Sequence, residues 1–487
     1  MSANAQPAPG SSAPDAGWTA AELADVTDGS WLVAPADHAW RALGICAESS
    51  QFKPGQMVLA QAGAAGLDPA VVGRLLPYAA GVIAQSEKAQ SYAHQGRPVL
   101  AVKDLRETVA ALGADARRRF AGTVVAVTGS VGKTSTVAMA AHALASAGES
   151  DRSRTSANSP YGIAWNFASM NREAAFWVQE VAATRMEICS ELMQAHAAIV
   201  TAIAPAHVAR FGSVEAIARQ KAKIYGSMTP GGIAVINADM PEFAIFEAAA
   251  LAARLRVVRF GSLPGVDARL LDVEGSMVRV DILGLELAFE LGAAGRHMAM
   301  NATAVLAAVA ALGLPVHAAA QRLGSFEPLR GRGQRSDVVH AGKRIQVWDE
   351  SYNANPASMR AALHVMRDAG NAVPNASRLL VLGDMLELGE DAQTMHLELE
   401  SEIRSLHPDR VLLCGPQMRA LWERLSADVP GAWYADIKAL LPAVETWLRD
   451  GDVVLVKSSN GTGLTNVVRL LSGQLPQPPV HRDQVSV

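Results

Sequence analysis

The sequence predicts an α/β fold in three domains: a small α/β N-terminal domain, a central domain with a parallel sheet of the P-loop type, and a C-terminal doubly wound, Rossmann-like domain. A length of 487 residues suits roughly three domains of ordinary size. From Gly122 onward, buried apolar runs alternate with amphipathic helical stretches, the pattern of parallel sheets with crossover helices. A Gly- and Arg-rich break near 328–335 interrupts this alternation. The predicted boundaries are a disordered tail over 1–17 and domains over 18–120, 121–328 and 329–487.

Composition indicates a large soluble protein. Half of the residues are apolar, 18% are charged, and the net charge is −4, so there is no overall positive field for nucleic acid or an anionic membrane. Cys46, Cys189 and Cys414 lie far apart without metal-ligand spacing, which favours a reducing cytoplasm. Residues 1–17 lack a signal peptide's charged and apolar regions. No run of 18 apolar residues predicts a membrane span.

Strands and helices can be placed by their apolar runs. Residues 255–290 shift to shorter alternating strands, which predict an antiparallel elaboration of the central sheet. A helix is expected to begin near Asn301 and to close before Gly313 and Pro315. The predicted buried strands are 57–63 and 81–87 in the first domain, 174–182, 197–204 and 231–239 in the second, and 345–351, 378–384, 409–415 and 451–457 in the third.

The stretch from Gly122 to Thr136, GTVVAVTGSVGKTST, predicts a buried strand that leads into a phosphate-binding loop and an Ala-rich helix. Lys133 would reach the β- and γ-phosphates of a triphosphate, and the Thr134 hydroxyl would bind Mg²⁺. The spacing is the short G-x-x-G-K-T form, and the alternative is a plain Gly-rich turn with an incidental lysine. The residues predicted to hold ATP here are Gly129, Ser130, Gly132, Lys133, Thr134 and Ser135.

Several further motifs follow in a fixed order and together resemble the Mur ligase superfamily. They are AIAPAH (202–207), QKAKIY (220–225), GRHMAMNA (295–302), GRGQR (331–335), DESYNANPASM (349–359), LGDMLELG (382–389) and GDVVLVKSS (451–459). The resemblance covers residues 120–470. SYNANP followed by LGDMLELG is most similar to the branch that adds D-alanyl-D-alanine to UDP-N-acetylmuramoyl-tripeptide.

This resemblance implies an ATP-dependent ligation through an acyl-phosphate, with Mg²⁺ neutralising the phosphates. It implies that Lys133, Glu180, His207 and Lys221 are the catalytic residues, with Thr134, Glu180, His207 and Lys221 at the metal. Lys221 matches a lysine that CO₂ converts to a carbamate, whose negative charge suits a metal ligand. Structural roles are the alternatives: a solvent-exposed carboxylate for Glu180, a structural histidine for His207, and a solvated lysine for Lys221.

The nucleoside is expected to lie at the helix that opens with GRHMAMNA and at the third domain. By resemblance, Asn301 would bind adenine, because an amide matches the donor and acceptor edge of the base. Arg332 and Asp349 would reach phosphate and ribose. Asn353 and Asn355 lie in a segment that the family places at the nucleotide, with ordinary turn chemistry as the alternative.

The two segments expected to bind the acid and the amine substrate depart from the family pattern. The family reads uridine diphosphate through Asp-Ser-Arg, whereas this chain has ESSQF over 48–52, so Gln51 replaces the arginine. Lys53 could supply the missing charge instead. Asn460 stands where an arginine would help to bind the carboxylate of the incoming amine substrate, and this change removes a bidentate clamp.

Three readings of the function remain at this point. The first is the D-alanyl-D-alanine-adding ligase of peptidoglycan synthesis, and the second is a paralogue that joins a different carboxylic acid and amine. The third is a non-catalytic nucleotide-binding scaffold. The expected partners are a small-molecule or UDP-linked carboxylate and an amino acid or dipeptide amine, with no nucleic acid and no membrane span. We expect a cytoplasmic monomer.

Overall fold

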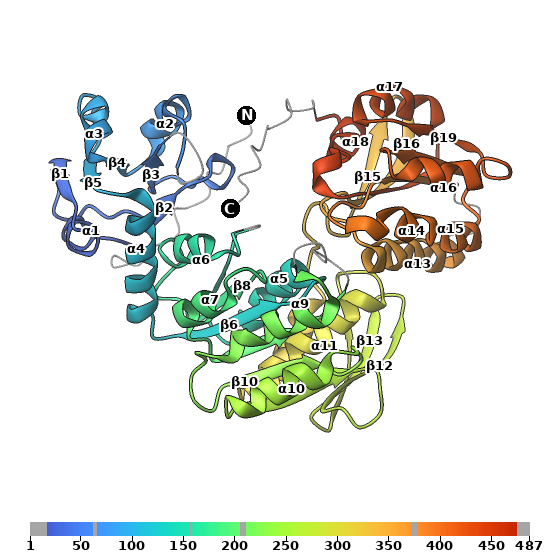
Figure 1. The fold of residues 1–487 in the computed structure, drawn as a ribbon, viewed down its shortest axis with the longest axis horizontal. Helices are drawn as coiled ribbons and strands as arrows, with labels where there is room; N and C mark the ends of the chain where they lie inside the picture. Colours follow the sequence, from blue (N-terminus) through green and yellow to red (C-terminus); the bar gives the residue numbers. More distant parts are fainter. Residues whose placement is uncertain (1–16, 62–65, 155–156, 205–210, 373–376, 475–487) are drawn as a thin grey trace, which may run out of the picture. The chain divides into compact units, whose positions relative to one another are not determined.

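The computed structural model describes residues 17–61, 66–154, 157–204, 211–372 and 377–474. The predicted tail over 1–17 therefore lies almost wholly outside the described residues. The chain divides into two compact units: 1–125, 148–181 and 188–194 form the first, and 126–147, 182–187 and 195–487 form the second. Its described residues form three sheets (Figure 1), and most of the paired strands in each run parallel. The α/β class is thereby confirmed, and the domain boundaries stay predictions.

The first sheet, blue in Figure 1, has the order β1-β5-β4-β3-β2. Four strands are parallel, and β1 closes one edge antiparallel to β5. Its core packs Val58 and Val82 of the sheet against Val72 of α2. The strands are β1 Ser30–Val33, β2 Ile45–Cys46, β3 Met57–Ala60, β4 Gly81–Gln85 and β5 Val99–Val102, and the helices are α1 Ala20–Thr27, α2 Pro69–Leu75, α3 Ser86–Ala89 and α4 Leu105–Arg119.

The second sheet has nine strands in the order β14-β13-β12-β11-β10-β9-β6-β8-β7. β9, β10, β11 and β12 run parallel, and β12, β13 and β14 form an antiparallel meander. Its strands are β6 Thr123–Thr128, β7 Ser150–Arg152, β8 Phe176–Glu180, β9 Ala197–Val200, β10 Ile233–Asn237, β11 Arg256–Gly261, β12 Ala268–Glu274, β13 Met277–Ile282 and β14 Leu285–Glu290. Its helices are α5 Lys133–Leu144, α6 Pro160–Phe167, α7 Met186–Met193, α9 Val214–Ala222, α10 Phe243–Ala252, α11 Arg296–Ala311 and α12 Val316–Leu323.

The third sheet has the order β15-β16-β20-β17-β18-β19, parallel except for β15 at one edge. One core packs α13, α15 and α16 on one face, and a second core packs α17 and α18 on the other. The strands are β15 Gln334–His340, β16 Lys343–Glu350, β17 Arg378–Gly383, β18 Arg410–Cys414, β19 Gly431–Tyr434 and β20 Val453–Lys457, and the helices are α13 Pro356–Ala372, α14 Ala392–Leu397, α15 Glu400–Leu406, α16 Met418–Leu425, α17 Ile437–Trp447 and α18 Thr465–Leu471. The predicted doubly wound domain is confirmed.

Several element predictions need correction. The antiparallel elaboration predicted over 255–290 begins only at β12, because β11 pairs parallel with β10. Helix α11 begins at Arg296, five residues before the predicted start, since Gly295 adopts a φ of +98° and ends the preceding extended segment. The strand predicted over 81–87 stops at Gln85, where α3 follows.

The three cysteines are buried thiols without disulfide partners. Within the described ranges, no helix is long and apolar enough to cross a membrane.

Candidate active site

The phosphate loop connects β6 to α5 and depends on two glycines. Gly129 has a φ of +149°, and a Cβ atom there would lie 2.0 Å from the Thr201 hydroxyl oxygen. Gly132 precedes α5 with a φ of +80°, a left-handed conformation that disfavours other residues. Substitution at either position would therefore strain the loop or move its neighbours.

Thr201, just after β9, holds this loop in shape. Its hydroxyl donates to the carbonyl of Val131 at 2.6 Å, and its amide donates to the carbonyl of Thr128 at 3.0 Å. The Ser130 amide donates to the carbonyl of Ala202 at 2.7 Å. Asn237 in turn donates to the Thr201 carbonyl at 2.7 Å. The loop is therefore pinned to the ends of two strands.

The polar groups of the loop suit a triphosphate. The Lys133 ammonium donates to the Ser130 carbonyl at 3.3 Å, so it folds over the loop. The Ser130 hydroxyl is buried and has no hydrogen-bond partner among the described residues. Thr134, 4% exposed, opens α5 with Ser135 beside it. The free N–H groups at the start of a helix favour an anion. A cradle with an unpaired hydroxyl fits bound phosphate.

Asn301 of α11 lies against the same loop. A Cβ atom on Gly132 would be 3.0 Å from the Asn301 side-chain oxygen, although 169 residues separate the two positions in the sequence. The structure thus brings together two predicted nucleotide-binding residues. It also explains Gly132 sterically, because a side chain there would displace the Asn301 amide.

Glu180 ends β8, as predicted from its apolar run. Its side chain is 5% exposed, which contradicts the solvent-exposed alternative. One carboxylate oxygen accepts from the Asn158 amide at 2.8 Å, and the Glu180 backbone N–H donates to the Ser153 hydroxyl at 3.0 Å. The carboxylate is therefore held in one orientation at the carboxyl end of a strand, where α/β sheets bind ligands.

Lys221 and Lys223 sit two residues apart in contrasting environments. Lys221 is 4% exposed near the end of α9, so it is not a solvated lysine. Lys223 is 47% exposed and pairs with Glu187 at 2.5 Å. Burial of an ammonium is costly. His207 lies outside the described residues. Among those described, no group of three or more His, Cys, Asp or Glu side chains could hold a metal.

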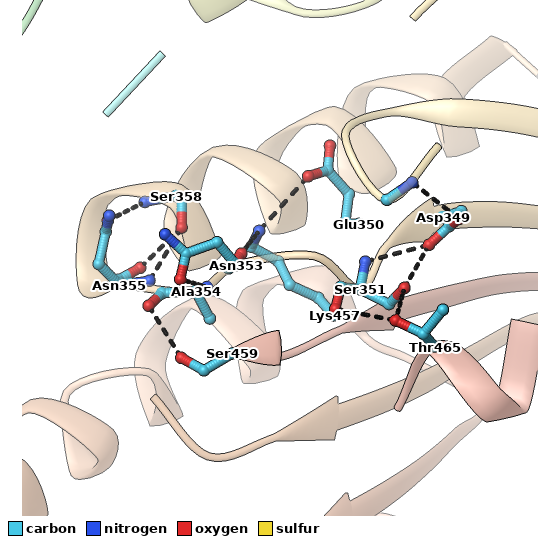
Figure 2. A network of polar contacts seen from close by, with 11 residues as sticks. Asp349, Glu350, Ser351, Asn353, Ala354, Asn355, Ser358, Lys457, Ser459 and Thr465 are labelled. Atoms are coloured by element: carbon cyan, nitrogen blue, oxygen red, sulfur yellow. Dashed lines mark hydrogen bonds and ion pairs between the residues drawn. The ribbon is translucent and has the colours of Figure 1, made fainter. Parts of the chain in front are cut away.

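Asp349, at the end of β16, braces the segment that carries Arg332. Its carboxylate accepts from the Gly331 amide at 2.8 Å and from the Ser351 hydroxyl at 2.6 Å, and Figure 2 shows Ser351 linked in turn to Thr465. The Arg332 guanidinium carbon lies 4.2 Å from the centre of the Tyr352 ring. Asp349 thus shapes the 331–333 turn, and Arg332 stacks on an aromatic ring beside it.

Asn353 and Asn355 form the turn before α13. The Asn355 side chain accepts from the Ser358 amide at 2.9 Å, and the Asn353 side chain accepts from the Ala354 amide at 2.9 Å (Figure 2). Lys457 of β20 donates to the Asn353 carbonyl at 3.1 Å and lies 3.4 Å from a Glu350 oxygen. Turn chemistry is thus part of the role of both asparagines, and Lys457 ties the turn to the neighbouring strand.

The second unit has a cleft of about 930 Å³ between two of the predicted motifs. Gly295 and Arg296, which open GRHMAMNA, line it together with Gly333, Gln334 and Arg335 of GRGQR. The Arg335 guanidinium carbon lies 3.8 Å from the centre of the Trp348 indole. Segments that are far apart in the sequence thus meet at a cavity large enough for a nucleoside.

Sequence reasoning missed several residues that shape the site. They are Thr201, which pins the phosphate loop, Asn158, which orients Glu180, and Lys457, which ties the 353–355 turn to its neighbouring strand. Thr201 and Lys457 each stand at the end of an apolar run, and polar residues at strand ends are a usable signal. Asn158 gives no local signal, because its partner is 22 residues away.

The fold and these features define an ATP-dependent ligase that forms carbon–nitrogen bonds. Residues 127–309 match the Mur ligase middle domain, and residues 334–460 match the Mur ligase glutamate ligase domain. The chain belongs to the Mur ligase family.

Among its relatives is the UDP-N-acetylmuramoyl-tripeptide–D-alanyl-D-alanine ligase of Escherichia coli, 30% identical over 388 residues, which cover 77% of this chain and 82% of the relative. The ligase of the same name from Mycobacterium bovis is 31% identical, with 72% of each chain covered. A crystal structure of MurF from Acinetobacter baumannii has a TM-score of 0.74 at 25% identity and covers 94% of this chain and 99% of its own.

Proposed function

We propose that this protein joins the terminal carboxylate of UDP-N-acetylmuramoyl-tripeptide to the amine of D-alanyl-D-alanine. The observation that carries the proposal is the similarity over 388 residues to a ligase of that name, covering 82% of the relative. Such extensive similarity favours this reaction over a paralogue with a different acid and amine. The intact phosphate loop and the buried Glu180 and Lys221 argue against a non-catalytic scaffold.

The chemistry requires activation of the acid. A carboxylate cannot expel oxide, so one of its oxygens attacks the γ-phosphorus of ATP and ADP leaves, forming an acyl phosphate. The amine then attacks the acyl carbon, inorganic phosphate departs with the carbon–oxygen bond electrons, and the nitrogen loses a proton to form the amide. Lys133 and the loop amides would stabilise the charge that develops on the transferred phosphoryl group.

Mg²⁺ is proposed by family resemblance, with Thr134 and Glu180 among its ligands. Each of these residues is buried and carries an oxygen donor, the kind that Mg²⁺ prefers. A carbamate on Lys221 would add a further oxygen ligand, and His207 is proposed at the same centre by family resemblance. Bound Mg²⁺ would neutralise phosphate charge and orient the acid.

Adenosine is proposed to bind in the second unit, where Asn301 meets the phosphate loop. Arg332 and the turn braced by Asp349 would hold its ribose and phosphates, with Asn353 and Asn355 beside them. Their hydrogen bonds pre-shape that turn, which supports binding because little ordering remains to be done. The protein is proposed to act as a monomer in the cytoplasm.

Phosphate release from purified protein tests the proposal. With ATP, Mg²⁺, UDP-N-acetylmuramoyl-tripeptide and D-alanyl-D-alanine, we expect stoichiometric phosphate and the UDP-linked pentapeptide, identified by mass spectrometry. Replacement of D-alanyl-D-alanine by L-alanyl-L-alanine is the matched control and should yield little product. No pentapeptide, with phosphate release on another acid and amine, would instead establish the paralogue.

A further inference from the structure

Two half-buried arginines lie at one edge of the second sheet: Arg152 is the last residue of β7, and Arg154 follows two positions later. Among the described residues, neither forms an ion pair with Asp or Glu. The nearby Asp151 carboxylate accepts instead from the Arg152 and Asn171 backbone amides, at 2.8 and 3.0 Å. Because burial removes water from the guanidinium groups, the pKa of each arginine is lowered. The Asp151 charge acts on both arginines, so one carboxylate offsets only part of the charge of two guanidinium groups.

Arg154 is held firmly in place. Its backbone N–H donates to the buried Asn166 side chain at 3.1 Å, and its guanidinium carbon lies 5.1 Å from the centre of the Trp165 ring. One terminal nitrogen, Nη1, is buried and has no hydrogen-bond partner among the described residues. Buried donors are nearly always paired, so an unpaired guanidinium nitrogen on a fixed side chain points to a ligand.

Arg154 lies close to Glu180, one of the residues proposed for the active site. β7 and β8 are parallel with Arg152 opposite Val178, so Arg154 is level with Glu180, whose backbone N–H donates to Ser153. On its other side, the Trp165 indole donates to the Ile45 carbonyl at 2.8 Å, at the end of the first sheet. All of these residues belong to one compact unit.

The neighbouring turn of the first domain lacks a cation of its own. The Cys46 thiol donates to the Glu48 carbonyl at 3.2 Å, and Cys46 follows Ile45, whose carbonyl accepts from the Trp165 indole beside Arg154. Over residues 48–52 the only charged side chain is Glu48. Lys53 is exposed.

We propose that Arg154 binds an oxyanion of the acid substrate, either a phosphate of its nucleoside diphosphate or a carboxylate of its peptide. Arginine suits both, because its planar guanidinium forms paired hydrogen bonds to either group. Arg152, the last residue of β7 and two positions before Arg154, adds positive charge. The proposal rests on the proposed function, since it assumes an acid that extends from Glu180 toward the first domain.

Isothermal titration with the ATP site filled by a non-hydrolysable analogue tests this role. The probes are UDP, which has the diphosphate alone, N-acetylmuramoyl-tripeptide, which has the carboxylates alone, and the complete UDP-linked tripeptide. We expect Arg154→Gln to weaken the complete ligand and one fragment about ten- to a hundredfold. Arg154→Lys should recover part of the affinity. The control is Arg106→Gln, an exposed arginine 5.9 Å from the Tyr161 ring centre, which should bind like the wild type.

The fragment that loses affinity identifies the oxyanion, phosphate for UDP and carboxylate for the peptide. Wild-type affinity of a folded Arg154→Gln variant for all three probes would overturn the assignment and leave the proposed function standing. If the wild type binds none of them, the proposed substrate is wrong. Arg154 is then tested by the KM for whichever acid supports phosphate release, and an unchanged KM in Arg154→Gln overturns it.

Discussion

At the scale of single residues, burial separates the side chains proposed for the site from others of the same type. Lys221 and Lys223 are two positions apart, yet one is buried and the other pairs with Glu187 in solvent. Glu180 and Glu187 show the same contrast. Lys221 and Glu180, the buried members of these pairs, are the ones proposed to meet metal or substrate.

Lys133→Ala tests the phosphate loop. Removal of the ammonium should lower the rate of phosphate release at least about a hundredfold, as loss of a charge-stabilising group at a transition state does. The fold should survive, because the Thr201 hydrogen bonds still pin the loop. Lys103→Ala, which removes an exposed lysine paired with Asp28, is the matched control. A wild-type rate for Lys133→Ala would disprove the phosphate-loop assignment.

Lys221→Ala tests the carbamate. We expect most activity to be lost and partly recovered by Lys221→Glu or by added short carboxylates, since each restores an anionic ligand. Lys223→Ala should retain activity because that side chain is exposed. A carbamate signal in ¹³C NMR of wild-type protein equilibrated with ¹³CO₂, absent from Lys221→Ala, is the direct measurement. Active enzyme without that signal would argue against the modification.

At the scale of elements, two buried side chains organise the loop between β17 and α14. Asp384 accepts from the Met418 amide at 3.0 Å and so caps α16. The His396 side chain accepts from the Met385 amide at 2.9 Å through Nε2, which requires the neutral ring. Burial lowers the pKa of His396 and raises that of Asp384. The LGDMLELG motif thus has a structural explanation in addition to any contact with substrate.

The pH dependence of unfolding tests this loop. Because His396 has a lowered pKa in the folded state, its contribution to stability is complete above the unfolded value of about 6.5 and is lost as the pH falls below it. The slope should be at most about 1.4 kcal/mol per pH unit. The raised pKa of Asp384 acts in the opposite sense, at lower pH, where its protonation favours the folded state.

Thermal unfolding of His396→Gln between pH 7 and pH 5 should show a smaller loss of stability than the wild type. The amide can still accept from Met385 and has no proton to gain. His407→Gln, at an exposed histidine, is the matched control. Equal pH dependence in His396→Gln and the wild type would refute this role of His396.

At the scale of the whole molecule, the residues proposed for the reaction are divided between the two compact units. The phosphate loop and Lys221 belong to the second unit, and Glu180 and Arg154 belong to the first. Transfer of phosphate to a carboxylate rather than to water requires that the acid be bound first.

We therefore expect phosphate release with ATP and Mg²⁺ alone to stay near background and to rise when the acid is added. The amine should then allow continuous turnover. Initial rates under the three conditions, with Lys133→Ala as the blank, measure this coupling. Acid-independent hydrolysis at the full rate would show that the protein is an ATPase rather than a ligase.

The sequence by itself determined the class of chemistry and the main strands. Gly129, Gly132, Lys133 and Thr134 fall where a strand, a tight turn and a helix require them, and that requirement is local in the chain. Glu180 was placed correctly at a strand end for the same reason. The short or polar strands β7, β15 and β19 were missed, because they lack a run of apolar residues or a clear alternation of apolar and polar ones.

Only the tertiary structure decided which distant residues meet. Asn301 lies against the phosphate loop at Gly132, and the Thr201 hydroxyl donates to the Val131 carbonyl. Trp165 lies beside Arg154 and donates to the Ile45 carbonyl. These contacts bring together segments 70 to 169 residues apart. Local propensity carries no information about such contacts, which arise when sheets and helices pack. Burial is likewise a property of the fold. It distinguishes Lys221 from Lys223, and it leaves one Arg154 guanidinium nitrogen without a hydrogen-bond partner among the described residues.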